Sequence, residues 1–469
     1  MKKIVILGAG ITGLAAADRL LELGRHDVTV VEAEDRVGGL AATVRRDGIA
    51  TDLGPHRLYS ELPEARAYWN ALLGERLFRV RRASRMHLGG RWLDYPLRLG
   101  QLVRVLGVGR TARIAASLAL AKAAGPLRLG RALNFEAAMK RAFGAAAYRM
   151  AFEPFTRKVW RTDPAELSAE IARLRLPDRG VVAAFGRLVR RGGRGGPLRH
   201  FEYVRGGIGG VAEALAERVG QRGGRIVLRS RVAGLRLGMT GVTSVEAARP
   251  TGGRAAIDAD AVLSTLPVPV LGGMLPVGDA DLRTALARLE YLGLILVALV
   301  LAKERVGPNH WLYFPEEPPR MSRASEPKNF DASMAPPDRT ALCCEMTCRL
   351  SEPLWEESDG AITARVIAEM AAIGLLRPED VTGSFVVRQS WGYPLYAVGF
   401  EKELERIWPY FARIPNLISA GRQGLFNHNN IDHSIVMGRR AAECLAAGRH
   451  PASEWYANLG QFAKFRIVD

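Results

Sequence analysis

Few cysteines, no long apolar run and a shortage of acidic residues set the first limits on this sequence. Four cysteines occur in 469 residues, and they lack the paired spacing of a metal site. This scarcity argues against a disulfide framework and predicts a reducing compartment, for which the cytoplasm is the natural choice. We expect no metal centre.

The longest apolar run covers residues 292–302 and is shorter than the roughly 20 residues that cross a bilayer. It predicts a buried strand and leaves no candidate for a transmembrane helix. The N-terminus, MKKIVILGAG, has the lysines and the brief apolar stretch of a signal peptide, but it continues into a glycine motif instead of a cleavage site. We therefore predict that it forms the first strand of the fold.

Basic residues outnumber acidic ones by 66 to 48, which gives a formal charge of +18. They are spread along the chain without the pattern of a nucleic-acid-binding module, so we expect no nucleic-acid partner. An anionic small substrate and an anionic membrane surface both stay open. The basic and apolar stretch 104–131 allows an interfacial membrane helix, although ordinary packing against the protein explains the same pattern and is favoured.

The first 32 residues predict a βαβ unit. KKIVIL is a strand-like run, residues 11–24 have helical periodicity, and VTVVE is a second strand-like run. A right-handed crossover of this kind implies a parallel sheet. RIVLRS, VAGLRL and DAVLSTLP, between residues 225 and 267, are expected to add strands to the same sheet, after a helix at 209–222.

Two blocks of different character interrupt these strands. Residues 97–200 are rich in alanine, leucine and arginine with helical spacing, and residues 290–414 mix strand-like runs with prolines. This alternation predicts a cofactor domain built from residues 1–96, 201–289 and 415–469. A substrate domain, from the mainly helical 97–200 and from 290–414, is inserted into it at two places. The last segment predicts a strand at NLIS and a helix over 434–447.

A G-x-G-x-x-G motif, formed by Gly8, Gly10 and Gly13, joins the first strand to the first helix. The first glycine permits a tight turn, the second lets backbone N–H groups approach a diphosphate, and the third allows close packing of helix on strand. Glu32 ends the second strand, where a carboxylate accepts hydrogen bonds from the ribose of an adenosine. Together these residues predict a dinucleotide cofactor, of either the nicotinamide or the flavin type.

The residues that follow favour a flavin. Glu32, Arg36, Gly38 and Gly39 give E-x-x-x-R-x-G-G, which resembles the signature of the FAD-dependent amine oxidase superfamily. That superfamily includes monoamine oxidases, protoporphyrinogen oxidases and carotenoid desaturases, with UDP-galactopyranose mutase as a relative. TDLGPHRLYS, residues 51–60, resembles its segment beside the flavin ring, and the G-P-H core is closest to the mutases. Residues 420–438 resemble its closing flavin motif.

The resemblance implies an α/β fold, with a Rossmann-like FAD-binding domain of the glutathione-reductase type and an interleaved α+β substrate domain. It implies FAD as the cofactor, with Gly421 and Arg422 on phosphate and Asp432 on ribityl or phosphate oxygens. The helix that begins near Ser434 would stabilise negative charge on a reduced flavin, and simple N-capping also explains Asp432 and Ser434. The predicted cofactor-binding residues are Gly8, Gly10, Gly13, Glu32, Arg36, Gly38, Gly39, Gly54, Pro55, His56, Val232, Gly421, Arg422, Asp432 and Ser434.

The same resemblance places a small organic substrate between the flavin ring and the inserted domain. We predict catalytic roles for His56 and Arg57, which lie within residues 51–60, the ring-proximal segment, and for Tyr393 and Tyr396, which precede the closing motif. Aromatic walls often flank such substrates, although packing explains the tyrosines equally well. A structural histidine is the alternative for His56.

Arg157 and Trp160 resemble a substrate-facing region of mutase-like members, and a solvated helix face is the alternative. Polar residues also crowd the last loop, at His428, Asn429, Asn430 and His433. There they could orient a polar ligand.

Hydride transfer from the substrate to flavin N5 is the leading hypothesis, in an enzyme of the oxidase or desaturase type similar to protoporphyrinogen oxidase. It needs mainly positioning, which suits a chain without a recognisable catalytic dyad. The lysine that the superfamily often places near N5 cannot be identified, so desaturation is better supported than amine oxidation.

The alternative is a non-redox mutase that rearranges a nucleotide sugar with a reduced flavin. GPHRLYS, the segment 84–97 and the many arginines favour it, whereas the chain is longer than a typical bacterial mutase. A flavin-bearing scaffold without turnover is the third and least favoured class.

Overall fold

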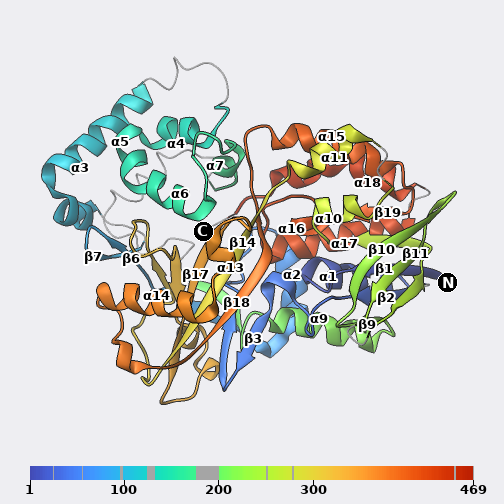
Figure 1. Cartoon of the computed structure of the whole chain (residues 1–469), viewed down its shortest axis with the longest axis horizontal. Coiled ribbons are helices and arrows are strands. Elements are labelled where there is room, and N and C mark those ends of the chain that lie inside the picture. Colours follow the sequence, from blue (N-terminus) through green and yellow to red (C-terminus); the bar gives the residue numbers. More distant parts are fainter. Residues whose placement is uncertain are drawn as a thin grey trace.

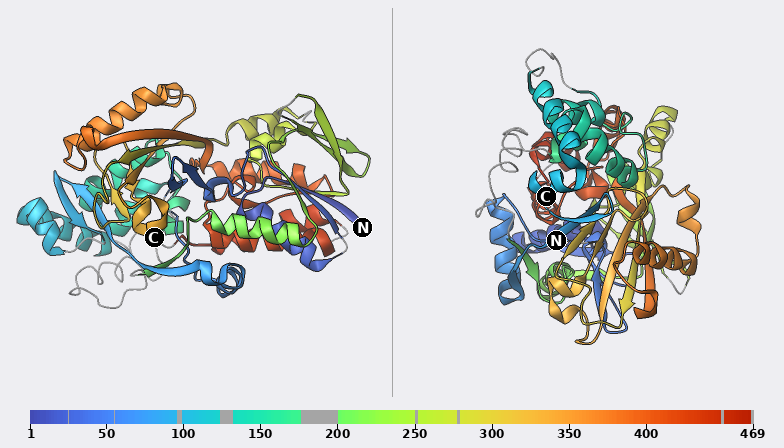
Figure 2. Two further views of the ribbon diagram at one scale, coloured as in Figure 1. Left: turned by 90° about the horizontal axis from the view of Figure 1, so that it is seen from below. Right: turned by 90° about the vertical axis from the view of Figure 1, so that its left-hand side faces the viewer.

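The computed structural model describes residues 1–24, 26–54, 56–95, 99–123, 132–175, 200–249, 252–276, 279–447 and 450–467. Figure 1 shows the arrangement of the elements, and Figure 2 adds two views from other sides.

A parallel sheet of five strands holds the N-terminal glycine motif. Its strand order is β19-β13-β1-β2-β9. β1 (Lys2–Leu7) pairs with β13 (Ala261–Ser264) on one side and with β2 (His26–Val31) on the other, while β9 (Arg225–Val227) and β19 (Leu417–Ser419) form the edges. Residues 4–7 are all buried, as expected for a parallel strand covered on both faces. The parallel sheet predicted from the first 32 residues is confirmed.

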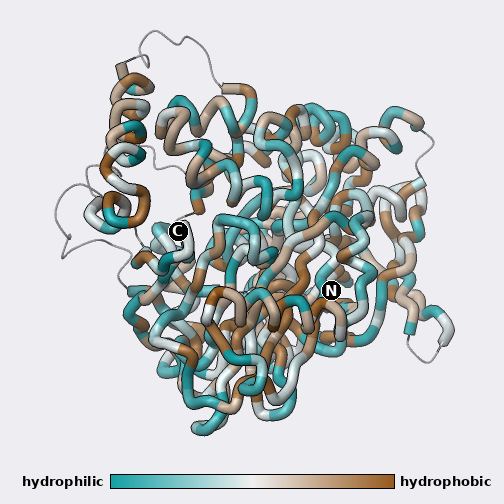
Figure 3. Tube along the Cα trace, turned by 60° about the vertical axis from the view of Figure 1, so that its left-hand side comes forward, coloured by the Kyte–Doolittle hydropathy of each residue, from teal (hydrophilic) through white to brown (hydrophobic). Residues whose placement is uncertain are grey.

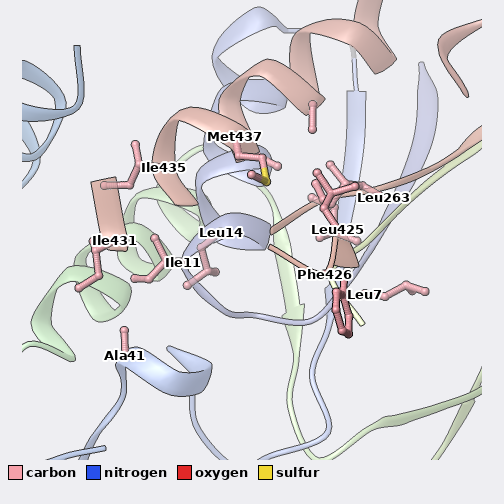
Figure 4. Close-up of a cluster of buried hydrophobic side chains, with 14 of the residues drawn as sticks. Leu7, Ile11, Leu14, Ala41, Leu263, Leu425, Phe426, Ile431, Ile435 and Met437 are labelled. Atoms are coloured by element: carbon pink, nitrogen blue, oxygen red, sulfur yellow. The ribbon is translucent and has the colours of Figure 1, made fainter. Parts of the chain in front are cut away.

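The two ends of the chain meet beside this sheet. α1 (Ile11–Leu23) packs against α17 (Ile431–Ala447) and α9 (Gly210–Gln221). The approach of α17 to α1 is so close that a Cβ on Gly438 would lie within 3.0 Å of the Thr12 carbonyl oxygen. Figure 4 shows side chains from both ends, among them Ile11 and Ile435, gathered in one buried cluster.

A second, mixed sheet of seven strands lies beside the first, in the order β18-β14-β17-β16-β15-β6-β7. Its second strand, β14, is buried at every position, which confirms the buried strand predicted from the longest apolar run. α14 (Asp359–Ala372) packs against β14 and β18. The strands are β6 (Ser84–Leu88), β7 (Arg91–Asp94), β14 (Tyr291–Leu301), β15 (Trp311–Tyr313), β16 (Arg323–Ser325), β17 (Thr340–Cys348) and β18 (Val381–Pro394).

A group of helices forms one end of the molecule, opposite the N-terminal strand (Figures 1 and 2). α3 packs against α4 and α5, and α6 contacts β17 of the seven-stranded sheet. The helices are α3 (Leu99–Ala123), α4 (Phe135–Phe143), α5 (Ala145–Ala147), α6 (Glu153–Trp160) and α7 (Glu170–Arg175). The helical group and five of the seven strands come from the two blocks 97–200 and 290–414, whereas β6 and β7 precede them.

Shorter elements complete the fold. They are β3 (Thr43–Arg46), β4 (Ile49–Asp52), α2 (Pro63–Leu73), β5 (Leu77–Arg81), β8 (His200–Val204), α10 (Val268–Gly273), α11 (Ala280–Ala287), α12 (Pro327–Phe330), α13 (Pro353–Glu356), α15 (Phe400–Ala412), α16 (Gly421–Gly424) and α18 (Pro451–Ala457).

One strand prediction is wrong. VAGLRL forms part of β10 (Arg231–Gly238), which belongs to a separate antiparallel sheet with β11 (Gly241–Ala248) and β12 (Arg254–Asp258). β10 pairs with its immediate neighbour, with Leu235 opposite Val245, and its residues largely alternate between exposed and less exposed positions. Such alternation is typical of an antiparallel strand with one face in water, whereas the strands of the parallel sheet are apolar on both faces.

The predicted start of the last helix and the predicted domain segments can also be compared with the structure. The last long helix begins at Ile431, three residues before the predicted start at Ser434. The division of the chain into five segments stays a prediction; β6 and β7, which lie within segment 1–96, pair inside the seven-stranded sheet.

Hydropathy along the chain follows these layers, with many hydrophobic residues in the inner strands and hydrophilic residues in the outer turns (Figure 3). Within the described ranges, every helix is too short or too polar to span a membrane.

Candidate functional site

The glycine motif brings two backbone segments together at the start of α1. Gly38 pairs with Gly10 as an isolated parallel bridge, and the Gly38 N–H donates to the Ala9 carbonyl oxygen at 2.9 Å. Gly38 and Gly39 both have positive φ, at 111° and 54°, a conformation that favours glycine. A Cβ on Gly13 would lie within 3.0 Å of the Gly8 carbonyl oxygen, whereas a Cβ on Gly10 would meet no atom within 4 Å. Gly13 therefore serves packing, and Gly10 faces open space.

Within the described residues, no side chain competes with an anion for the N–H groups at this end of α1. Gly10 is the N-cap residue, no side chain caps the helix, and the first turn contains no acidic residue. The positive end of the helix dipole and its free N–H groups are thus available to a phosphate. This geometry fits the predicted approach of a diphosphate to Gly10.

Glu32 lies directly after β2 and is buried. One carboxylate oxygen accepts a hydrogen bond from the Ala9 N–H at 2.7 Å, and the other accepts from the Glu34 N–H at 2.9 Å. Each oxygen keeps a lone pair for a further donor. The carboxylate is therefore fixed beside the glycine turn, where a ribose hydroxyl would reach it.

Arg36 and Val232 are two further residues predicted to bind the cofactor. Arg36 forms ion pairs with Asp35 at 3.1 Å and with Glu34 at 4.0 Å. Val232 lies buried on β10. The Glu32 backbone carbonyl accepts a hydrogen bond from the Ser230 N–H at 2.8 Å, which connects the end of β2 to the residue before β10.

The ring-proximal segment follows β4. Gly54 has a positive φ of 89°, and its carbonyl oxygen accepts a hydrogen bond from His56 Nδ1 at 2.8 Å. Because a carbonyl only accepts, Nδ1 carries the proton and Nε2 is an acceptor. Burial, helped by the charge of Arg422, lowers the pKa of His56 to about 4, so the ring is neutral at physiological pH. Pro55 lies outside the described residues.

The closing motif places polar groups around the start of α17. Asp432 is buried; its Oδ2 accepts a hydrogen bond from the Ser60 hydroxyl at 2.6 Å. The Ser434 hydroxyl donates to Asn429 Oδ1 at 3.3 Å. Ser60 belongs to the ring-proximal segment, so this bond joins the two segments that were predicted to flank the flavin.

Several buried polar atoms here have no hydrogen-bond partner within the described part of the chain. They are Asp432 Oδ1, Asn429 Nδ2 and Gln423 Oε1. Such atoms are costly to bury unless a partner is supplied. A flavin offers hydroxyl, carbonyl and ring N–H groups, so these residues fit its ribityl chain and ring.

Gly421 and Arg422 begin α16, next to α1. Gly421 has a φ of 88°, its N–H points to the Met437 sulfur at 2.9 Å, and a Cβ there would lie 2.8 Å from the Thr12 hydroxyl. Arg422 donates to the Asn429 carbonyl oxygen and lies over the Tyr393 ring, 5.7 Å from its centroid. Gly421 therefore lies close to the start of α1, at Thr12, and Arg422 is held by the Asn429 carbonyl oxygen.

Aromatic side chains converge on His428 from α6, from β18 and from the loop after β18. Trp160 of α6 meets the His428 ring edge-on at 5.1 Å, and Tyr393 of β18 stacks on it at 5.9 Å. Tyr396 is buried, stacks on Phe400 at 4.1 Å, and accepts a hydrogen bond from the His428 N–H through its hydroxyl. The contacts of Tyr396 are thus structural, while Tyr393 and Trp160 lie together as an aromatic wall.

The sequence-based prediction missed a buried ion pair beside this wall. Arg323 of β16 donates to both carboxylate oxygens of Glu345 on β17, at 2.7 and 2.9 Å. Burial disfavours the charged guanidinium, but the Glu345 carboxylate outweighs burial and raises the pKa of Arg323. A Cβ on Gly54 would lie 3.2 Å from Glu345 Oε2, so the pair adjoins the ring-proximal segment.

A signal for Glu345 existed in the sequence, since it is the single charged residue in the strand TALCCEMTC. Arg323 gave no such signal, because it lies among prolines and other arginines. Ser60 lies within the predicted flavin segment 51–60, and Gln423 and Asn429 lie within the segment 420–438. Only the fold shows that these side chains point inward.

The buried lysines of the described residues are both engaged elsewhere. Lys158 donates to the carbonyl oxygens of Phe314 and Pro319 at 2.8 and 2.6 Å, and burial lowers its pKa to about 8. Lys328 donates to those of Pro336 and Pro337 at 2.6 and 2.8 Å. Lys158 holds α6, and with it Trp160, against the loop that follows β15.

Residues 11–446, nearly the whole chain, match the family described as flavin containing amine oxidoreductases. This chain belongs to that family. It is accordingly a flavin-dependent oxidoreductase by family, and the α/β fold that the resemblance implied is confirmed.

Solved structures of similar fold cover almost the entire chain. A reduced UDP-galactopyranose mutase is 24% identical, with a TM-score of 0.81 over 100% of this chain and 98% of that one. A protein assigned as a protoporphyrinogen oxidase, from Exiguobacterium sp. 255-15, is 20% identical with a TM-score of 0.70 over 94% and 98%. A putrescine oxidase with bound putrescine is 18% identical with a TM-score of 0.64 over 95% and 99%.

Among curated proteins, a 4,4'-diapophytoene desaturase from Staphylococcus aureus is 47% identical over 53 residues. The match covers 11% of this chain and 10% of the desaturase, so the chain aligns with only a tenth of that relative's length.

Proposed function

We propose that this protein binds FAD and transfers a hydride from a small organic substrate to flavin N5, as an oxidase or desaturase of the protoporphyrinogen oxidase type. One observation carries the proposal. The open space at Gly10 and the unpartnered Asp432 Oδ1 lie at the starts of two helices, α1 and α17, that pack against each other. An elongated cofactor with a diphosphate and a polyhydroxyl chain satisfies both.

The position of Glu32 supports FAD rather than a mononucleotide. Its carboxylate is held at the end of β2 by the Ala9 and Glu34 N–H groups. An adenosine ribose presents two hydroxyl donors to such a carboxylate. A flavin mononucleotide has no adenosine half, so it would leave Glu32 without its ligand.

The bound flavin supplies the electron chemistry by accepting a hydride at N5. The protein residues then need to position the substrate and exclude water, more than to move protons. His56 suits this role, because its ring is neutral and its Nε2 is left as an acceptor for a substrate N–H or O–H group. Tyr393 and Trp160 supply the aromatic wall.

The substrate is proposed to be a small organic molecule, and the guanidinium of Arg422 near His56 suits an anionic one. Desaturation fits better than amine oxidation, since the two buried lysines are bonded to backbone carbonyls. For Arg57 we propose a place at the same site, because it follows His56 directly.

A non-redox mutase is the second candidate. The seven-stranded sheet and the helical group match a UDP-galactopyranose mutase along the full chain, and Arg422 packs over the ring of Tyr393. An arginine stacked on an aromatic ring is suited to hold a diphosphate next to a planar group. This arrangement favours a nucleotide sugar as the alternative substrate.

One reaction series separates the two candidates. The purified yellow protein is mixed anaerobically with an amine, a porphyrinogen and a carotenoid precursor, and the visible flavin absorption is followed. In parallel, the dithionite-reduced protein is incubated with UDP-galactopyranose and the products are separated. Bleaching by an organic substrate supports the proposal, whereas conversion of the nucleotide sugar without net electron transfer contradicts it and supports the mutase.

The cytoplasm is the proposed location. It rests on the cysteine content, with four free cysteines of which three are buried. Fractionation of the native cells with a specific antibody tests this placement. Recovery of the protein in a secreted fraction would contradict it.

A further inference from the structure

We propose that the outward face of α3 docks onto a membrane surface rich in anionic lipid. α3 lies at the tip of the helical group, far from the parallel sheet (Figure 1). Its inward face packs against α4 and α5, where the Ser117 hydroxyl accepts a hydrogen bond from the Ala146 N–H at 3.1 Å. Leu118 and Ala121 are buried on the same face.

The outward face is apolar, which is unusual for a helix surface in water. Beyond the kink at Gly107, exposed residues recur with helical spacing at Val108, Ala112, Ala116, Ala119, Leu120 and Ala123. Val108 is 75% exposed and Leu120 is 71% exposed. In Figure 3 the helix at the upper left, next to the grey segment, is largely coloured as hydrophobic. A partner that covers this face would remove apolar surface from water.

The charged residues of α3 all have one sign, because the helix contains no aspartate or glutamate. Residues 95–135 contain seven lysines and arginines and no aspartate or glutamate. Four of them, Arg104, Arg110, Arg113 and Lys122, lie on α3, and within the described residues none of the four forms an ion pair. Basic residues next to an apolar helix face are the pattern of an interfacial helix on anionic lipid.

A membrane fits this face better than a protein partner. Residues 96–134 contain no aromatic side chain, and the exposed face is mostly alanine. Protein interfaces usually depend on a few large anchors such as tryptophan or tyrosine. A lipid surface needs no such shape match, since it responds to apolar area and positive charge.

Vesicle flotation of the full chain tests the proposal. The probes are vesicles of phosphatidylcholine mixed with phosphatidylglycerol, and vesicles of phosphatidylcholine alone. We expect binding to the mixed vesicles only, weakened by added salt. Arg110→Gln/Arg113→Gln should lower the partition coefficient about thirtyfold, from about 1 kcal/mol for each charge at an anionic surface. Val108→Ser/Leu120→Ser should lower it about tenfold.

The matched control is Arg79→Gln/Arg231→Gln, which removes two exposed arginines from β5 and β10. It should leave vesicle binding unchanged. Equal binding to both vesicle types, or none, would overturn the proposal, as would an unchanged Arg110→Gln/Arg113→Gln variant. Light scattering after gel filtration covers a further outcome: a dimer that Val108→Ser/Leu120→Ser dissociates would mean that the face joins two copies of the chain.

Discussion

Replacing Gly10 with alanine tests whether the cofactor diphosphate occupies the open space beside this residue. Gly10 has φ −72° and ψ 174°, a backbone conformation that alanine adopts without strain, and a Cβ there meets no protein atom within 4 Å. The cost to the cofactor-free fold is therefore limited to the weaker N-cap preference of alanine, about 1 kcal/mol or less.

The effect on FAD should be much larger. A methyl group at Gly10 would occupy the space in which backbone N–H groups approach the diphosphate, and a hydrogen bond to a charged group contributes about 1.5–3 kcal/mol. Losing one such bond lowers FAD affinity about tenfold to a hundredfold. Titration of the cofactor-free protein with FAD, followed by flavin fluorescence, measures the affinity, and urea denaturation measures the free energy of unfolding.

Gly13→Ala is the matched control, because it makes the same chemical change one helical turn further on. Its Cβ would lie within 3.0 Å of the Gly8 carbonyl oxygen, a backbone atom, so the free energy of unfolding should fall by about 1–3 kcal/mol even without cofactor. If Gly10→Ala instead bound FAD with unchanged affinity, the diphosphate would not lie at this turn and the assignment would be wrong.

Three further predictions concern Asp432, His56 and the Arg323–Glu345 ion pair. Asp432→Asn keeps a partner for Ser60 but removes a carboxylate oxygen, so FAD affinity should fall about tenfold; an unchanged affinity by fluorescence titration would contradict the assigned role. The folded-state pKa of His56, about 4, lies below 6.5, so neutral His56 contributes stability above pH 6.5 that is lost as pH falls toward 4. Between pH 6.5 and 4, the free energy of unfolding measured with urea should fall by about 2 kcal/mol less in His56→Asn than in the unchanged protein. Parallel pH profiles for the two proteins would contradict this. Arg323→Met should destabilise the fold by about 3–5 kcal/mol because it leaves Glu345 buried and unpaired, and adding Glu345→Leu should recover most of that loss in the same assay.

Local signals predicted the parallel sheet well. The run KKIVIL, the glycine spacing and Glu32 each depend on neighbouring residues and on a short crossover, so their geometry follows from the sequence itself. The misassigned strand β10 shows the limit of this approach. A strand-like run predicts strand formation, whereas its partner depends on whether the second face is covered or exposed to water.

The site was predictable in part. Motif resemblance pointed to residues 51–60 and 420–438, and the structure joins these segments through the Ser60–Asp432 hydrogen bond. The Arg323–Glu345 pair could not be predicted, because the two residues come from different strands of a sheet whose register no local pattern specifies. The basic and apolar stretch 104–131 did allow an interfacial helix, but the sequence could not show which face of α3 is exposed.

The most direct test of the central claim is a crystal structure of the protein with FAD. We expect one FAD for each chain, with its diphosphate at Gly10 and Gly38, its ribose on Glu32 and its ribityl chain within hydrogen-bond distance of Asp432. A flavin bound elsewhere, or a chain that crystallises without taking up added FAD, would contradict it.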